Sequence, residues 1–397
     1  MALSAKPKNP ASELVEANTS FALDVYRQLL KMTPGDNIFA SPLSISAALA
    51  MTSLGARGDT ASQMKKVLRL ESLSDTDVHT SFSELLAALS EPNVPYTLWT
   101  ASRLFVSRQH KFLDDFVNAT RNHYGAEAAL ADFESDAEGA RLAINKWVEE
   151  QTAENIKDLL PDGSVDSLMA IVLVNAVYFK GNWAAKFDSR GTHDSLFIVN
   201  AQEKVNVKMM SRHGEYRLCV DSTLDCQILQ LPYVSDRLAM VVLLPRQLDG
   251  LESLEKNLTA DRLQQALRAI SSARLVEVDV SLPKFRLEQT CPLTDVLVAL
   301  GMGDLFAADK ADLSGMDGGR QLYVSSAVHK AFIDVTEEGS EAAAATAVVT
   351  VRKLGFIFKT EEFVANHPFL FLIADNRSGS VLFLGRLARP PVSGLSI

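Results

Sequence analysis

Histidine, serine and cysteine, the side chains that most often perform catalysis, are scattered along this sequence without a catalytic spacing. The seven histidines are His79, His110, His123, His193, His213, His329 and His367. They form no HExxH zinc pair, and the sequence contains neither a GxSxG nucleophile turn nor a GxxxxGK phosphate loop. The three cysteines lack CxxC spacing and are too few for a disulfide scaffold. We therefore expect no enzyme, no metal site and no cofactor.

Residues 337–353 have an unusual pattern that suits two structures. Four consecutive alanines favour a helix, whereas the Val/Thr run that follows favours a strand. Alternate positions from Ser340 to Thr350 are small or uncharged, and no proline interrupts the run, so this face could be buried in a sheet. The segment ends in two cations, Arg352 and Lys353. It is either a surface helix followed by an edge strand, or a loop that can become a central strand.

The remaining patterns predict helices first and strands later. Ser41 followed by Pro42 is a helix start, and Thr60 with Gln63 forms a capping-box pattern before a second helix. Residues 171–179 are apolar apart from Asn175, which predicts a central strand covered on both faces. Residues 276–281 and 327–336 alternate as half-buried strands do, and residues 369–373 and 381–384 flank turn residues as in a hairpin. The predicted class is α+β.

Composition excludes some functions. The chain has 397 residues, is 47% hydrophobic and carries a net charge of -10, which disfavours nucleic-acid binding. The only basic run, Lys65, Lys66 and Arg69, has helical spacing and fits a solvated helix face better than a polyanion site. No apolar leader and no run of eighteen apolar residues occurs, so no membrane span is predicted. Localisation stays open between export after removal of a leader, a leaderless cytoplasmic protein and non-classical secretion.

Four Asn-x-Ser/Thr sequences are candidate glycosylation sites if the chain enters the secretory pathway. They stand at Asn18, Asn118, Asn257 and Asn376.

Over essentially its whole length the sequence resembles the serpin family. The matching segments are residues 37–45, residues 175–181 with Trp183, residues 282–285, residues 337–346, residues 366–371 and residues 383–386. The resemblance implies one domain over residues 1–397, with three β-sheets, eight or nine helices and an exposed reactive-centre loop at 337–358. It also implies a monomer that inhibits serine proteases: the protease cleaves the loop, becomes acylated, and is trapped when the loop inserts into the main sheet.

Family spacing assigns roles to individual residues. The hinge of the loop is Glu337, Glu338, Gly339, Ser340, Glu341, Ala342, Ala343, Ala344, Ala345 and Thr346, with Ser340 where Thr is usual. The shutter, a polar cluster beneath the main sheet, is Ser41, Ser44, Asn175 and His329. The breach, where the loop first enters, is Trp183, Lys284 and Glu337, with an ion pair expected between Lys284 and Glu337.

The resemblance places the cleaved bond at Lys353-Leu354, or at Arg352-Lys353 if the register differs by one. Either cation suits a specificity pocket with a carboxylate at its base, as in trypsin-like proteases. The alternative is a non-inhibitory serpin with a carrier, chaperone or storage role. Bulky, charged or proline residues in the hinge would favour that alternative, and this hinge has small residues.

Overall fold

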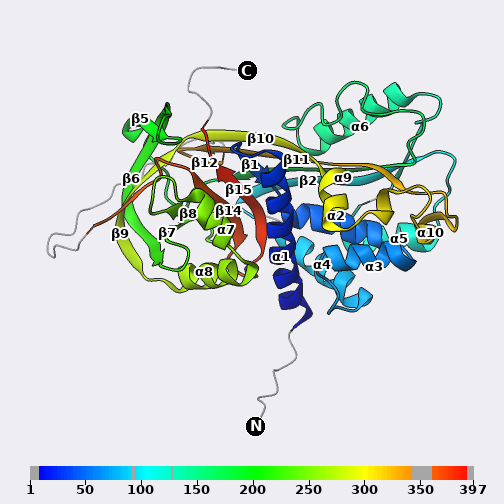
Figure 1. Cartoon of the computed structure of the whole chain (residues 1–397), viewed down its shortest axis with the longest axis horizontal. Coiled ribbons are helices and arrows are strands. Elements are labelled where there is room, and N and C mark those ends of the chain that lie inside the picture. The colour runs from blue at the N-terminus through cyan, green and yellow to red at the C-terminus, as the bar shows by residue number, and fades with distance from the viewer. Residues whose placement is uncertain (1–8, 92–93, 127, 341–359, 391–397) are drawn as a thin grey trace, which may run out of the picture.

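The computed structural model describes residues 9–91, 94–126, 128–340 and 360–390. Its α-helices are α1 (Pro10–Met32), α2 (Pro42–Ser53), α3 (Gly58–Val67), α4 (Asp75–Leu89), α5 (Asp114–Tyr124), α6 (Ala137–Gln151), α7 (Leu251–Asn257), α8 (Ala260–Ser272), α9 (Leu293–Leu300) and α10 (Ser314–Asp317). Helices α2 to α5 lie on one side of the long strands and α6 lies on the other (Figure 1). None of the helices in these ranges is long and apolar enough to cross a membrane.

One sheet has six strands in the order β10-β11-β4-β2-β3, with β12 added to β11. These strands are β2 (Tyr96–Ser107), β3 (Ala129–Ala131), β4 (Ile171–Gly181), β10 (Phe285–Pro292), β11 (Val324–Thr336) and β12 (Gly339–Ser340). The central pair, β4 and β11, is parallel, whereas β4 pairs antiparallel with β2 and β11 pairs antiparallel with β10. We call this the main sheet.

The other strands form a nine-stranded, strongly bent sheet. They are β1 (Ile38–Ala40), β5 (His193–Ile198), β6 (Lys204–Asp221), β7 (Cys226–Pro232), β8 (Leu238–Pro245), β9 (Leu275–Pro283), β13 (Glu361–Val364), β14 (Phe369–Asp375) and β15 (Val381–Leu387). The start of β6 pairs with β5 and its end with β7, so this long strand is shared by two groups of strands. With the main sheet they give the predicted three-sheet α+β architecture, and the described residues contain ten α-helices rather than eight or nine.

Strand β4 shows why its sequence is apolar at nearly every position. Ile171, Leu173 and Val177 contribute to the large core that contains α1 and α2. Val172 and Val174, pointing the other way, join a second core beneath α6. Because successive side chains of a strand point to opposite faces, a strand with a core on each face needs apolar residues throughout. The prediction of a doubly covered central strand is confirmed.

Other local predictions have mixed outcomes. The hairpin is β14 and β15, which pair antiparallel, and Ser41 does cap α2, accepting a hydrogen bond from the Ser44 amide. The capping box at Thr60 and Gln63 is wrong, because α3 already begins at Gly58. Both side chains instead accept hydrogen bonds from distant backbone amides, those of Asp312 and Asp304.

Candidate functional site

The four predicted shutter residues lie together beneath the main sheet. The backbone N–H of Ser41 donates to Nε2 of His329 over 3.0 Å, and Nδ1–H of His329 donates to Oδ1 of Asn175 over 2.6 Å. The amide of Asn175 then donates to Oγ of Ser44 over 2.7 Å. His329 and Asn175 are register partners on β11 and β4, so this hydrogen bond spans the central strand pair.

The same geometry sets the protonation state of His329. Its side chain is fully buried, and burial lowers its pKa to about 3, outweighing the hydrogen bond to Asn175. A proton on Nε2 would also face the N–H of Ser41, which needs an acceptor there. His329 is therefore neutral, and it joins β11, β4 and the start of α2.

The sequence interpretation missed a fifth member of this network, Ser102 on β2. Its hydroxyl accepts a hydrogen bond from the Asn175 amide over 2.6 Å, and the two residues are register partners. Serine in a strand carries no signal of its own, so only the register of β2 against β4 identifies it. The cluster thus extends over three adjacent strands of the main sheet.

The three predicted breach residues lie at the far end of β4 and β11. Lys284 Nζ is 2.7 Å from a carboxylate oxygen of Glu337, as expected for the ion pair. Burial acts to raise the pKa of Glu337, but hydrogen bonds from Lys284 and Thr192 outweigh it and hold that pKa below its usual value. The Trp183 indole donates to the Thr336 carbonyl over 2.9 Å, fixing the ring at the strand end.

The first residues of the predicted hinge lie in the main sheet, at the ends of β4 and β11. The pairing of β11 with β4 ends at Phe332 and Tyr178. Beyond that point, Gly339 pairs with Thr336 of β11 and Ser340 pairs with Val335. On its other side Gly339 bridges to Asn182, directly after β4. Strand β12 therefore sits between the ends of the two central strands. The rest of the hinge, Glu341 to Thr346, and the cleavage residues Arg352, Lys353 and Leu354 lie outside the described residues.

Gly339 is required at this position for two reasons. Its φ is +135°, and a Cβ there would lie 2.1 Å from the carbonyl oxygen of Gly181. An adjacent contact, the 2.9 Å hydrogen bond from the Trp183 amide to the Glu338 carbonyl, holds the hinge against the end of β4. Glu338 also forms an ion pair with Lys186.

Strand β11 also makes polar contacts on the α6 side of the sheet, and these were not predicted. Lys330, buried on β11, donates from Nζ to the carbonyl of Lys157 over 2.8 Å and lies 2.8 Å from a carboxylate oxygen of Glu288 on β10. Lys157 belongs to the segment that leads from α6 into β4. His329 and Lys330 therefore fasten the same strand on opposite faces of the sheet.

The side chains that could hold a metal ion or act as thiol nucleophiles can be compared within the described ranges of the chain. These ranges contain no group of three or more His, Cys, Asp or Glu side chains that could hold a metal ion. The cysteines are free thiols, and burial raises the pKa of Cys226 and of Cys291 to about 12, which keeps both protonated. Two residues of the basic run face acids, with Lys65 2.9 Å from Asp75 and Arg69 2.8 Å from Asp24.

The four glycosylation candidates differ in accessibility. Asn18 is only 3% exposed in α1 and accepts a hydrogen bond from Ser46, so a glycan there would disrupt the packing of α1 on α2. Asn376 is partly buried, and its amide bonds to Gln230 and Asp236. Asn118 and Asn257 are exposed. The prediction at Asn18 is incompatible with this structure.

Comparison with known proteins shows the family of this chain. Residues 16–390 match the serpin (serine protease inhibitor) family. This chain belongs to the serpin family. It is 45% identical to a horse (Equus caballus) protein named leukocyte elastase inhibitor, over 95% of this chain and 100% of the relative. It is 40% identical to human serpin B3, over 96% and 100% of the two chains.

Solved serpin structures share the fold. Uncleaved ovalbumin has a TM-score of 0.85 and 35% identity, covering 95% of this chain and 100% of ovalbumin. Human thyroxine-binding globulin has a TM-score of 0.87 and 31% identity, covering 96% and 100%. Membership in a family of protease inhibitors is consistent with the expectation that the chain is not an enzyme.

Because His329 is buried and neutral, we predict that this serpin loses stability in acid. Between pH about 6.5 and 3, His329 is protonated in the unfolded chain but stays neutral in the folded chain. The free energy of unfolding therefore falls as pH falls, and this residue contributes up to about 1.4 kcal/mol per pH unit. Urea unfolding of the wild type and of His329→Gln at pH 7 and pH 4.5 measures this change in unfolding free energy. The variant should be less stable at pH 7 but show the smaller pH dependence, whereas exposed His193→Gln should match the wild type. Equal pH dependence in His329→Gln and wild type would contradict the prediction.

Gly339→Ala should detach the hinge from the end of β4. The new Cβ collides with backbone, so we expect a loss of about 2 kcal/mol or more in unfolding free energy and faster hydrogen exchange at the Trp183 amide. Gly35→Ala is the matched control, because Gly35 also has positive φ, +87°, but nothing lies within 4 Å of its Cβ position. If both variants lose the same stability and Trp183 exchange is unchanged, crowding at Gly339 does not hold the hinge.

Proposed function

We propose that this serpin is an irreversible suicide inhibitor of trypsin-like serine proteases. The protease cleaves the loop after Lys353, or after Arg352, and remains as an acyl-enzyme while the loop inserts between β4 and β11. The observation that carries the proposal is the position of β12, whose two residues already lie between the ends of these strands. Insertion then needs no new entry point, only continued separation of the same pair.

The balance of hydrogen bonds supports insertion. Opening the junction breaks the ladder between β4 and β11, which joins eight residue pairs from Ile171–Val324 to Tyr178–Phe332. An inserted strand forms a ladder with each neighbour, so one ladder is lost and two are gained. At roughly 1 kcal/mol net per hydrogen bond, the extra ladder with its apolar burial supplies on the order of 10 kcal/mol. The uncleaved form is therefore kinetically trapped.

The hinge sequence supports inhibition over a carrier, chaperone or storage role. Thyroxine-binding globulin shows by its name that a protein with this fold can serve in ligand binding. Beyond Glu341 the hinge of this chain consists of four alanines and a threonine, so no side chain of residues 342–346 opposes burial in the sheet. We therefore favour the inhibitor.

The paired cations support trypsin-like specificity. Relatives are named for inhibition of leukocyte elastase, a protease of the class whose specificity pocket accepts small side chains. Lys353 and Arg352 instead suit a pocket with a carboxylate at its base. We propose that this serpin has the family's mechanism with a different preference at the cleaved bond.

The first test is incubation with trypsin and with leukocyte elastase. We expect a trypsin complex that survives boiling in detergent, a released fragment beginning at Leu354 or Lys353, and greatly increased heat resistance of loop-cleaved protein. Lys353→Val should lower the rate of trypsin inhibition at least tenfold and raise that of elastase, because a small side chain fits the elastase pocket. Cleavage by trypsin without a stable complex or any gain in heat resistance would falsify the inhibitory mechanism.

Alternation in the inserted strand gives a second prediction. Ser340 is the register partner of Val335, which belongs to the large core, so we place Ala344 against that core and Ala345 on the α6 side. An aspartate facing the core opposes insertion, because burying an unpaired carboxylate is costly. Ala344→Asp should turn the inhibitor largely into a substrate, measured as the ratio of cleaved serpin to complex.

Ala345→Asp is the matched control and should impair complex formation less, because continuing the register of β12 with β11 places residue 345 opposite Lys330, whose ammonium can pair with the new carboxylate. Equal impairment by the two variants would contradict this strand register. It would not contradict the inhibitory mechanism itself, which the incubation with trypsin tests.

A further inference from the structure

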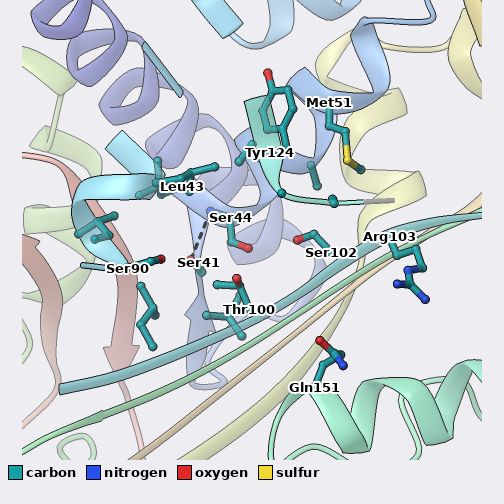
Figure 2. Close-up of a pocket in the computed structure, with 18 of the residues that line it drawn as sticks. Ser41, Leu43, Ser44, Met51, Ser90, Thr100, Ser102, Arg103, Tyr124 and Gln151 are labelled. Carbon is teal, nitrogen blue, oxygen red and sulfur yellow. Dashed lines mark hydrogen bonds between the residues drawn. The ribbon is translucent and has the colours of Figure 1, made fainter. Parts of the chain in front are cut away.

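Tyr124, the last residue of α5, connects two hollows of the molecule. Figure 2 shows it in the cavity beside the shutter, which Ser44 and Ser102 also line, with its hydroxyl turned away from both serines. That hydroxyl lies 2.6 Å from Nδ1 of His79 on α4 and forms a hydrogen bond with it. His79 in turn lines a second hollow on the outer side of Tyr124.

The second hollow has a volume of about 670 Å³ and lies between the end of α2, α3, the start of α4 and the end of α5. These helices are neighbours on one side of the main sheet (Figure 1). Two histidines line the hollow, His79 from α4 and His123 from α5. Because they come from different helices, no spacing in the sequence indicates that they form a pair.

The two imidazole rings are separated as two ligands of one metal ion would be. Their centroids lie 5.8 Å apart and their planes are inclined by 42°. A Zn–N bond is about 2.1 Å long, so two imidazoles on one tetrahedral ion have centroids roughly 5 to 6 Å apart. The observed pair therefore needs only small side-chain rotations to hold one ion between the rings.

Each ring has a nitrogen to offer. Nδ1 of His79 is bonded to Tyr124, which leaves Nε2 of that ring. His123 contacts the rings of His79 and Tyr124, but it makes no hydrogen bond to any residue that the structure describes. A histidine that binds a metal commonly has its other ring nitrogen held by a hydrogen bond, which orients the ring. Tyr124 holds His79 in this way.

The charged side chains of the hollow are engaged with other groups. Lys65 lies 2.9 Å from a carboxylate oxygen of Asp75, so its charge is compensated next to the histidines. Arg57 donates to the carbonyls of Leu54 and Ala56. The hollow therefore offers two imidazole ligands, with space for the water molecules that would complete a tetrahedral shell.

We propose that His79 and His123 bind one divalent transition-metal ion of the Zn²⁺ type, through one ring nitrogen each and with water as the remaining ligands. Imidazole nitrogen suits Zn²⁺, whereas Mg²⁺ and Ca²⁺ prefer oxygen ligands. The ion joins α4 to α5. With two protein ligands it binds reversibly, so it fastens these helices only while the metal is supplied. The site does not depend on the proposed inhibition of proteases.

Calorimetric titration of chelator-treated protein with Zn²⁺ tests the site, with Mg²⁺ as the control ion. We expect a Zn²⁺ binding event that His123→Gln weakens at least tenfold, and no heat of binding with Mg²⁺. His213→Gln is the matched control and should keep this event. It removes an exposed histidine of β6 whose two nitrogens face Glu277 and Asp279, the other place where Zn²⁺ could meet a histidine beside carboxylates.

Three results would overturn the proposal: no Zn²⁺ binding by the wild type, wild-type affinity in His123→Gln, or loss of the event in His213→Gln instead. His123→Gln breaks no hydrogen bond to the described residues, so it should fold, and urea unfolding in metal-free buffer checks this.

A second comparison shows whether the two histidines share one ion. If they do, His79→Gln and His123→Gln each remove most of the binding, and the double variant binds Zn²⁺ no more weakly than either single variant. Losses that add in the double variant would mean two separate surface sites and would contradict the proposal. If His79→Gln does not fold without its bond to Tyr124, the titration of His123→Gln against His213→Gln decides.

Discussion

The pairing of β4 with β11 is the contact on which the rest of the structure depends. These two strands are adjacent and parallel at the centre of the main sheet, and each carries the core of the protein on both of its faces. A stable fold would ordinarily have no reason to part such strands. Here the chain places a two-residue strand at the end of the pair, where it bonds to one strand and bridges to the residue after the other.

The polar groups at this junction explain how a closed sheet is held without being made permanent. Asn175 and His329 join the strands beneath the sheet, and Lys330 reaches the segment before β4 on the other side. Apolar packing alone resists sliding only weakly, whereas a buried hydrogen bond has a defined geometry and is expensive to leave unmade. These contacts hold the junction closed, and in the proposed mechanism the inserting strand has to break them.

The sequence predicts the parts of this arrangement that depend on neighbouring residues. Ser41 with Pro42 forms a helix start wherever it lies, and the apolar run of β4 reports coverage on both faces. The family motifs bring Asn175 and His329 together, although 154 residues separate them. Ser102 and Lys330 could not be found this way, because a serine and a lysine within strands acquire their roles only from register and from the segment packed above them. The capping box predicted at Thr60 and Gln63 was wrong for a related reason: both side chains bond to backbone amides distant in the sequence instead of capping a helix.

The two fastenings on β11 have a consequence for timing. Because His329 and Lys330 are consecutive, their side chains bond to opposite faces of the sheet, to the start of α2 and to the segment before β4. Loss of one of these contacts leaves the other in place. If each contact opens only briefly and independently, the chance that both are open at one moment is the product of two small fractions. Two modest contacts on opposite faces of one strand can therefore keep it in place longer than a single contact of intermediate strength, so a chance fluctuation on one face of the sheet does not release β11.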